Sequence, residues 1–268
     1  MRIALTIAGS DSSAGAGIQA DLKTFAAHDV YGVSAITAVT AQNTKGVACA
    51  APIAADLVTA QIEAVVSDLT VHAAKTGMLA NAAIVEAVAA AADALEIPLL
   101  VVDPVIVASS SDRLLDDEGL LAMKKELLRR AHAVTPNISE AEVLSGISIL
   151  TEQDRREAAR RIFDLGPAHV VITGGHAASD RIVDLVYDGE VFTDYATHRV
   201  SGRHTHGTGC AFSAAVTAHL ALGRSLHDAI PRAQEYVAGA IRHAPGLGHG
   251  AGPMNHFWRL NIDKAGRL

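Results

Sequence analysis

Residues 3–27 read IALTIAGSDSSAGAGIQADLKTFAA and combine a short apolar run, a loop of small residues and a segment with helical spacing. Ile18, Leu22 and Phe25 recur at intervals of four and three residues, which places them on one face of a helix. The mostly apolar run before Gly9 has the length of a buried strand. This stretch predicts a strand, a loop and a helix in that order, which is the repeating unit of an α/β fold.

The same alternation continues over the rest of the chain. Strands are predicted at residues 3–8, 33–41, 73–75, 99–102, 133–135 and 170–173, with a hairpin formed by 181–187 and 191–195. Helices are predicted at residues 15–27, 55–69, 82–95, 117–130, 152–165, 210–222 and 226–242. Strands that alternate with helices favour a mostly parallel sheet covered on both faces. Because no low-complexity linker or internal repeat interrupts the pattern, residues 1–268 are expected to form a single domain.

The bulk composition narrows the functional class. The chain of 268 residues is 50% hydrophobic, which supplies a sizeable core, and its formal net charge is −7. An acidic chain is a poor match for a phosphate backbone, so no nucleic-acid partner is expected. No apolar run reaches the roughly 18 residues of a membrane-spanning helix, so no membrane partner is expected. The two cysteines, Cys49 and Cys210, are too few for a disulfide scaffold, and a reducing cytoplasm is the expected location.

A second informative stretch, HTHGTGCAFSAAV at residues 204–216, joins a glycine-rich turn directly to an alanine-rich helical segment. The start of a helix leaves several backbone N–H groups without partners and carries the positive end of the helix dipole, so this turn suits an anion. Cys210 lies within reach of that anion, and a helix N-terminus is expected to lower the pKa of its thiol, which would suit a base. The alternative is a tight turn in which Cys210 is a small core residue.

Small and polar residues follow several of the predicted strands, where parallel α/β folds place their sites. The small residues at 9–17 would let a ligand approach the backbone closely, although they also suit an ordinary strand–helix loop. Asp21 is expected either in solvent or against a ligand N–H or hydroxyl group. Gln42 can donate and accept hydrogen bonds at once, which suits the edge of a heteroaromatic ring, but in isolation it is better explained as a polar loop residue.

Two acidic residues after strands are candidates for a magnesium site. Asp103 follows one apolar strand, and Asn137 and Glu140 follow the next. Magnesium binds few protein carboxylates and keeps several waters, which suits Asp103 and Glu140. The structural alternative is strong, because Asn137 and Glu140 have the spacing of a helix capping box. A zinc site built on His204 and His206 is disfavoured, because the sequence offers no convincing set of partner ligands.

Six blocks that occur in order along the chain resemble one enzyme family. They are residues 3–25, TAVTAQNT at 37–44, AKTGML at 74–79, VDPV at 102–105, TPN at 135–137 and HGTGC at 206–210. Each block is weak alone, but together they span nearly the whole chain and resemble the hydroxymethylpyrimidine/phosphomethylpyrimidine kinases of thiamine biosynthesis. These enzymes belong to the ribokinase-like superfamily, so the resemblance implies a ribokinase-like three-layer α/β/α fold with a mostly parallel central sheet. A homodimer is also expected.

The resemblance also implies an activity. Such enzymes use ATP to phosphorylate the hydroxymethyl group of 4-amino-5-hydroxymethyl-2-methylpyrimidine, and then phosphorylate the monophosphate to the diphosphate. The implied co-substrate is ATP and the implied cofactor is Mg²⁺. The runner-up is a pyridoxine or pyridoxal kinase of the same superfamily, whose acceptor is also a heteroaromatic ring with a hydroxymethyl group. A third alternative is a pyrimidine-binding protein that lacks catalysis.

Site roles carry over from the family position by position. Cys210 occupies the position of the base, where the wider superfamily has aspartate. The implied catalytic turn consists of Gly207, Thr208, Gly209 and Cys210. The implied pyrimidine-pocket residues are Gly9, Asp21, Gln42, Met78 and Val105. The implied ATP- or phosphate-binding residues are Asn137, Thr173, Gly175, Gly207 and Gly209. The implied Mg²⁺ residues are Asp103 and Glu140, acting through water.

One position departs from the family pattern. The family usually has a lysine before the paired glycines of its Val-Lys-Gly-Gly-His block, whereas residues 171–176 read VITGGH and place Thr173 there. The missing positive charge could otherwise steady the transferring phosphates. The departure puts the second phosphorylation in doubt and keeps vitamin B6 kinase activity open.

Overall fold

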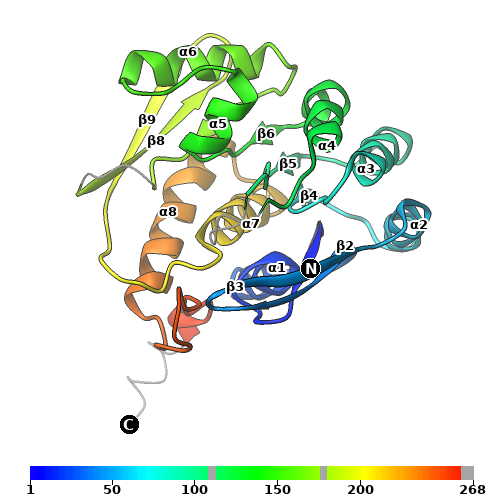
Figure 1. Cartoon of the computed structure of the whole chain (residues 1–268), viewed down its shortest axis with the longest axis horizontal. Helices are drawn as coiled ribbons and strands as arrows, with labels where there is room; N and C mark the ends of the chain where they lie inside the picture. The colour runs from blue at the N-terminus through cyan, green and yellow to red at the C-terminus, as the bar shows by residue number, and fades with distance from the viewer. Residues whose placement is uncertain (108–112, 176–179, 261–268) are drawn as a thin grey trace.

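The computed structural model describes residues 1–107, 113–175 and 180–260, which form a nine-stranded sheet with helices on both faces (Figure 1). The strands are β1 (Arg2–Asp11), β2 (Val30–Asn43), β3 (Gly46–Pro52), β4 (Ala73–Thr76), β5 (Leu100–Val102), β6 (Ala133–Val134), β7 (Val170–Ile172), β8 (Arg181–Tyr187) and β9 (Phe192–His198). Their order across the sheet is β3-β2-β1-β4-β5-β6-β7-β8-β9. The neighbouring strands β2, β1, β4, β5, β6 and β7 run parallel, while β3, β8 and β9 pair antiparallel at the two edges.

The helices form the two outer layers. They are α1 (Gly17–Ala27), α2 (Ala55–Val66), α3 (Ala82–Ala94), α4 (Asp117–Ala122), α5 (Ile138–Ser145), α6 (Glu152–Phe163), α7 (Thr208–Ala221) and α8 (Leu226–Arg242). Helices α1, α7 and α8 cover one face of the sheet, and α2 to α6 cover the other (Figure 1). The predicted three-layer α/β/α fold with a mostly parallel sheet is therefore confirmed.

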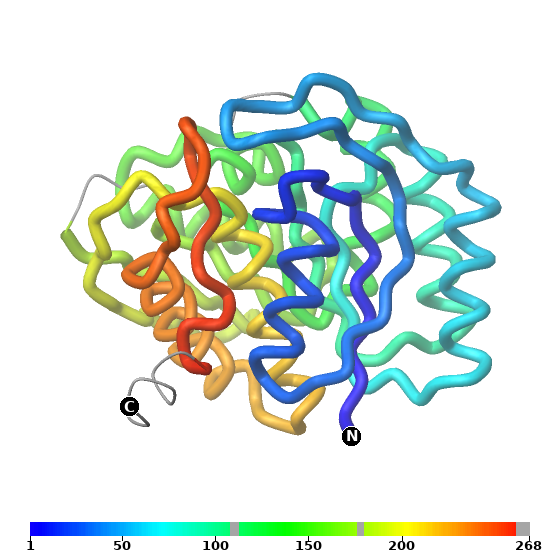
Figure 2. The backbone as a smooth tube through the Cα atoms, turned by 90° about the horizontal axis from the view of Figure 1, so that it is seen from below, coloured from blue at the N-terminus to red at the C-terminus, as the bar shows by residue number. Residues whose placement is uncertain are grey.

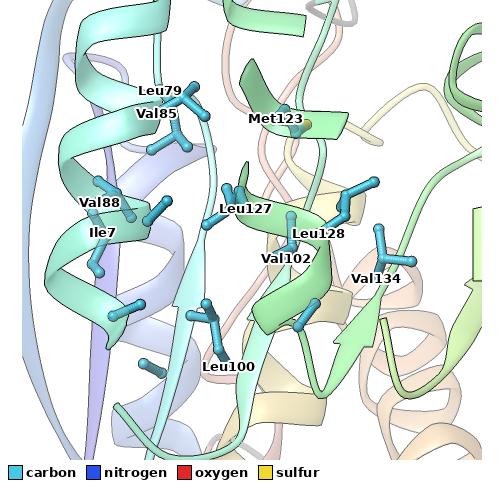
Figure 3. Packing of buried hydrophobic residues seen from close by; sticks show 14 of the residues in the cluster. Ile7, Leu79, Val85, Val88, Leu100, Val102, Met123, Leu127, Leu128 and Val134 are labelled. Atoms are coloured by element: carbon cyan, nitrogen blue, oxygen red, sulfur yellow. The ribbon is translucent and has the colours of Figure 1, made fainter. Parts of the chain in front are cut away.

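Each central strand contributes to both cores, because neighbouring side chains point to opposite faces of a sheet. In β5, Leu100 and Val102 belong to the core beneath α2 to α6, whereas Val101 belongs to the core beneath α1, α7 and α8. Figure 3 shows Val85 of α3 and Leu127 of the segment after α4 in the first core. Burial on both faces explains why these strands appear in the sequence as continuous apolar runs.

The structure corrects the predicted elements at two places. The strand predicted at 33–41 is longer and turns back into β3, which the sequence analysis missed. Most residues of β3 are exposed, and its sequence GVACAAP has no alternation of apolar and polar residues to reveal a strand. The helix predicted at 117–130 is α-helical only to Ala122 and then continues as a π-helical turn (Met123–Leu127) and a 3₁₀ turn (Leu128–Arg130).

The parallel strands bring their carboxyl ends to one edge of the sheet, and the turn before α7 packs against the loop after β1 at this edge. The segment after α8 returns along α1 (Figure 2) and reaches the β2–β3 turn, where Gly250 N–H donates to Thr44 Oγ1 at 3.2 Å. The segment after α8 and the β2–β3 turn, which are distant in the sequence, therefore meet. None of the helices in the described ranges has the length and apolar character needed to span a membrane.

Candidate active site

The glycine-rich turn at residues 204–210 leads into α7, as the sequence predicts. Gly207 precedes the helix with a φ of +79°, and a Cβ there would lie 1.9 Å from the carbonyl oxygen of Gly15. Only glycine fits a left-handed position packed this closely. A Cβ at Gly209 would meet no atom within 4 Å, so space is open beside the first helical turn. An anion in that space would meet unpaired N–H groups and the positive end of the helix dipole.

Cys210 lies in the first turn of α7 and is half-buried. Burial raises the pKa of its thiol, Lys75 opposes the increase, Asp103 and Asp21 add to it, and the resulting pKa is about 12. The lowered pKa expected at a helix N-terminus is therefore not supported for this thiol, because burial and two carboxylates act in the opposite direction.

A buried cluster of charged side chains adjoins Cys210. Lys75 of β4 is fully buried, and its Nζ lies 2.9 Å from Asp21 Oδ1 and 3.9 Å from Asp103 Oδ2. The other carboxylate oxygen of Asp21 accepts a hydrogen bond of 2.6 Å from the Thr6 hydroxyl. Burial alone would lower the pKa of Lys75, but Asp21, Cys210 and Asp103 raise it above its ordinary value. The ammonium group therefore stays charged and serves as the shared counter-charge of the cluster.

This cluster corrects the expectation for Asp21. The sequence analysis placed Asp21 in solvent or against a ligand, yet the residue is 0% exposed and its carboxylate is occupied by Lys75 and Thr6. Lys75 itself received no role from the sequence. The sequence did contain an indication of this role, namely a lysine within the short buried strand AAKT. A buried ammonium group requires a buried partner of opposite charge.

Asp103 and Glu140 lie near enough for their charges to interact. Burial, followed by the negative charge of Asp103, raises the pKa of Glu140 to about 8. Asp103 Oδ2 also accepts a hydrogen bond of 2.9 Å from Ser213. Two neighbouring carboxylates that lack a full counter-charge fit Mg²⁺, which takes few protein ligands and keeps several waters. Within the described ranges, no three His, Cys, Asp or Glu side chains gather as a metal site, so water and phosphate would supply the remaining ligands.

The capping-box interpretation of Asn137 and Glu140 is confirmed. Glu140 N–H donates to Asn137 Oδ1 at 3.0 Å, and Asn137 N–H donates to Glu140 Oε2 at 2.9 Å. The cap fixes the start of α5 at the end of β6 and holds the Glu140 carboxylate beside Asp103. The structural and functional interpretations of this pair are therefore compatible.

The other predicted pyrimidine-pocket residues follow or belong to four strands, with Gly9 in β1, Gln42 in β2, Met78 after β4 and Val105 after β5. A Cβ at Gly9 would lie 3.1 Å from Met78 Sδ, so Gly9 and Met78 are in contact. Val105 is half-buried in the loop after β5, and its N–H donates to the carbonyl oxygen of Asp103 at 2.9 Å. Met78 lines a pocket of about 370 Å³ together with Ala50, Pro52, Ala80 and residues 113–117.

Gln42 opens onto a different pocket, of about 330 Å³, lined by residues 42–46, His206, Gly250 and Ala251. The structure thus brings Gly9 and Met78 together but divides Met78 and Gln42 between two pockets. His206 Nε2 lies 2.9 Å from Asp11 Oδ2 and 3.3 Å from Gln42 Nε2. The sequence analysis considered His206 only as a disfavoured zinc ligand and assigned no role to Asp11.

The predicted ATP-side residues gather after β6 and β7. Thr173 N–H donates to the carbonyl oxygen of Pro136 at 2.9 Å and forms a parallel bridge with Asn137. A Cβ at Gly175 would meet no atom within 4 Å, so its backbone is accessible. Arg199 Nη1 donates to the carbonyl oxygen of Gly175 at 2.9 Å, which places a guanidinium group beside the loop that lacks the family's lysine.

His176, the last residue of the VITGGH block, lies outside the described residues. The preceding Gly174 is held by the buried carboxylate of Asp184, whose Oδ1 accepts its N–H at 2.8 Å. Asp184 Oδ2 in turn accepts a hydrogen bond of 2.8 Å from Gln234 of α8. The loop after β7 is therefore anchored through α8, a contact that no local sequence pattern indicates.

Comparison with known proteins identifies the family of this chain. Residues 11–255 match the family model described as phosphomethylpyrimidine kinase. The chain belongs to this kinase family. It is 48% identical over 255 residues to the hydroxymethylpyrimidine/phosphomethylpyrimidine kinase of Bacillus subtilis (strain 168), and the match covers 95% of this chain and 94% of that relative.

Two solved structures show the same fold. The pyridoxal kinase from Staphylococcus aureus, in complex with AMP-PCP and pyridoxal, aligns with a TM-score of 0.89 at 39% identity, over 98% of this chain and 96% of that chain. The phosphomethylpyrimidine kinase from Clostridium difficile 630 aligns with a TM-score of 0.80 at 39% identity, over 90% of this chain and 100% of that chain. The predicted ribokinase-like fold and the predicted phosphotransferase class are confirmed.

Proposed function

We propose that this kinase transfers the γ-phosphoryl group of ATP to the hydroxymethyl group of 4-amino-5-hydroxymethyl-2-methylpyrimidine, and then phosphorylates the monophosphate to the diphosphate. The observation that carries the proposal is the open turn before α7, which adjoins a cluster of buried charges at the carboxyl edge of the sheet. Phosphoryl transfer requires positioning and neutralisation of charge more than covalent chemistry, and this edge supplies both.

The turn would hold the transferring group. The N–H groups of Gly209 and Cys210 lie in the first turn of α7, where an oxyanion meets donors at the positive end of the helix dipole, whereas the Thr208 N–H already donates to the carbonyl oxygen of Thr205 at 3.3 Å. Asn137, Thr173 and Gly175 would contact the ATP phosphates from the neighbouring strands. Asp103 and Glu140 would hold Mg²⁺ through water, and that ion supplies neutralisation of the phosphate charge when bound.

The acceptor would lie between Gly9 and Gln42, with its hydroxymethyl group toward Cys210. In this pose Gln42 binds the ring edge, and Gly9, Met78 and Val105 enclose the ring. Asp21 then acts indirectly, by keeping Lys75 charged beneath the site. Cys210 would accept the hydroxyl proton as its thiolate, a minor form at neutral pH because the pKa of the thiol is about 12.

Pyridoxal or pyridoxine is the second candidate acceptor. The observation that favours this acceptor is that a pyridoxal kinase bound to pyridoxal shares the fold, with a TM-score of 0.89. The test is a side-by-side turnover assay with ATP and three acceptors, namely the pyrimidine, its monophosphate and pyridoxine. We expect the highest kcat/KM with the pyrimidine. A preference for pyridoxine would overturn the proposal, and the absence of turnover with every acceptor would instead favour the non-catalytic alternative.

We also propose a homodimer in the cytoplasm. The edge strand β3 and the exposed Val39 of β2 offer an apolar surface, and both cysteines are free thiols, as expected in a reducing compartment. Light scattering should give twice the mass of the chain. A monomeric mass at micromolar concentration would contradict the dimer.

A further inference from the structure

His206 is a buried junction between three segments that are distant in the sequence. Its Nε2 lies 2.9 Å from Asp11 Oδ2 at the end of β1 and 3.3 Å from Gln42 Nε2 in β2. Its backbone N–H donates to the carbonyl oxygen of Gly252 at 3.3 Å in the C-terminal segment. The next residue is Gly207, the first residue of the anion turn (residues 207–210). Any movement of the His206 side chain or backbone would therefore displace both Gln42 and the anion turn.

The Asp11 carboxylate acts only as a hydrogen-bond acceptor. Its Oδ1 accepts from the N–H and hydroxyl of Ser13, both at 2.8 Å, and its Oδ2 accepts from the N–H groups of Gly15 and Ala16 at 3.1 and 2.9 Å. Burial alone would raise the pKa of Asp11, but these bonds and the one from His206 lower it to about 2. Since an ionised carboxylate has no proton to donate, His206 Nε2 must carry the hydrogen of the contact with Asp11.

The tautomer of His206 determines which end of the Gln42 amide can face it. The single Nε2 hydrogen points toward Asp11 and can be shared with Gln42 only if an acceptor faces it. The Gln42 carbonyl oxygen must therefore face His206, and a half-turn of the amide places it there. The amide NH₂ then faces Thr40 Oγ1, which lies 3.1 Å from the amide and donates its own hydrogen to the carbonyl oxygen of Ser10 at 3.0 Å. In this orientation no two donors face each other.

We propose that the Asp11–His206 pair positions Gln42, fixing its amide so that one carbonyl lone pair and one N–H remain for the acceptor ring. An aminopyrimidine presents an exocyclic N–H next to a ring nitrogen, and an amide with fixed orientation can bind both at once, as glutamine binds adenine. A pyridine ring without an exocyclic amine offers no such pair. His206 and Asp11 therefore set the selectivity for aminopyrimidines, an inference that rests on the proposed function.

The test compares His206→Leu, His206→Gln and Asp11→Asn with Gln42→Leu and with the double variant that carries His206→Leu and Gln42→Leu. His204→Leu is the matched control, because His204 lies in the same turn and does not contact Asp11 or Gln42 through any described hydrogen bond. The measurements are KM for the pyrimidine, for pyridoxine and for ATP, together with kcat. Thermal unfolding identifies variants that do not fold.

We expect His206→Leu to raise the KM for the pyrimidine by roughly 10- to 100-fold while the KM for ATP is unchanged. The double variant should lose no more than Gln42→Leu alone, because the two residues act through one contact. His206→Gln should recover much of the loss, since its amide N–H can still reach Asp11. Asp11→Asn, which keeps the volume and removes the charge, should reduce the preference for the pyrimidine over pyridoxine.

Additive losses in the double variant, or equal losses for ATP and the pyrimidine, would overturn the positioning role. If His206→Leu does not fold, an unchanged selectivity in Asp11→Asn would overturn it as well. Failure of the proposed function would be distinct, because wild-type protein would then prefer pyridoxine before any variant is compared.

Discussion

Cys210 has the position of a base in the anion turn but the pKa of a thiol that stays protonated, about 12. Burial explains most of the difference, because it disfavours the charged thiolate more than Lys75 favours it, and the carboxylates of Asp103 and Asp21 raise the pKa further. For a single residue, the position in a motif therefore does not determine the pKa of its side chain. A sequence motif indicates where a group stands, whereas its proton affinity depends on what packs against it.

The first prediction concerns Cys210→Ala. If the thiolate takes the acceptor proton, the substitution should reduce kcat by about 100-fold or more, the usual effect of a lost acid/base group. Wild-type turnover should also rise as the pH increases above neutrality, because the thiolate fraction grows toward its pKa of about 12. Steady-state kcat against pH tests both expectations, with Cys49→Ala on the surface as the control. A folded Cys210→Ala enzyme with wild-type turnover would remove Cys210 from the mechanism.

The second prediction concerns Thr173. Restoring the family's charge with Thr173→Lys should raise turnover of the monophosphate and leave turnover of the pyrimidine nearly unchanged, because a cation matters more as phosphate charge accumulates. Thr173→Met, which adds length without charge, is the control. Kinetics on both acceptors provide the measurement. The idea fails if wild type already prefers the monophosphate and the lysine variant gains nothing, in which case Arg199 beside Gly175 is the cation to examine next.

At the scale of elements, buried charges join strands to helices. Lys75 of β4 contacts Asp21 of α1 and approaches Asp103 after β5, and Ser213 of α7 donates to Asp103. One ammonium group thus connects β4 with the helix layer that contains α1 and α7. Such a tie is costly to break, because removing one partner leaves the others charged and buried.

The third prediction follows from this tie. Lys75→Met should lower the free energy of unfolding by about 3 to 5 kcal/mol, because Asp21 loses its counter-charge while remaining buried. Lys125→Met is the control, since the Lys125 side chain is 84% exposed. Urea unfolding measures both variants. Equal stability of the two would show that Asp21 is neutral in the folded protein.

The fourth prediction concerns the two glycines at the start of α7. Gly207→Ala should destabilise the protein by about 1 to 3 kcal/mol or more, because its Cβ would overlap Gly15 and its backbone is left-handed. Gly209→Ala should leave stability nearly unchanged, since its Cβ would meet nothing, yet it should reduce phosphoryl transfer by filling the open space. Thermal unfolding and turnover of both variants provide the test, and a stable Gly207→Ala protein would contradict the packing argument.

At the scale of the whole molecule, the two faces of the sheet differ in polarity. The layer that holds α1, α7 and α8 buries three histidines, namely His28 at the end of α1, His219 near the end of α7 away from the anion turn, and His256 in the segment after α8. Burial is the first cause that lowers the pKa of His219 to about 3 and of His256 to about 4. These rings stay neutral in the folded protein at a pH where the unfolded chain would bind protons.

The fifth prediction is a loss of stability in mild acid. Since the unfolded chain binds more protons below the ordinary histidine pKa of 6.5, this contribution is complete above that pH and declines as the pH falls toward about 4. Glu140 acts in the opposite sense, because its raised pKa of about 8 favours the folded state at lower pH.

The variant His219→Leu isolates the histidine contribution from that of Glu140. Urea unfolding at a series of pH values should show a shallower decline for His219→Leu than for wild type. His249→Leu, at an exposed position, should keep the wild-type decline. If the free energy of unfolding has the same pH dependence in all three proteins, His219 does not cause the loss of stability in acid.

The sequence by itself determined the features that depend on neighbours along the chain. Apolar periodicity identified most strands and helices, the glycine-rich turn located the start of α7, and the spacing of Asn137 and Glu140 gave the capping box. The order of motifs identified the family and therefore the fold and the kinase class. All of these follow from residues a few positions apart, or from the order of such motifs.

Tertiary structure alone decided the contacts between distant residues. Lys75 and Asp21 are 54 positions apart, and His206 and Asp11 are 195 apart, so no local pattern could pair them. The same holds for the pKa of Cys210, which depends on burial and on the charges of Lys75, Asp103 and Asp21. An unpaired charge is costly to bury, so buried charges occur in pairs. Which residues form a pair depends on how the folded chain brings distant segments together.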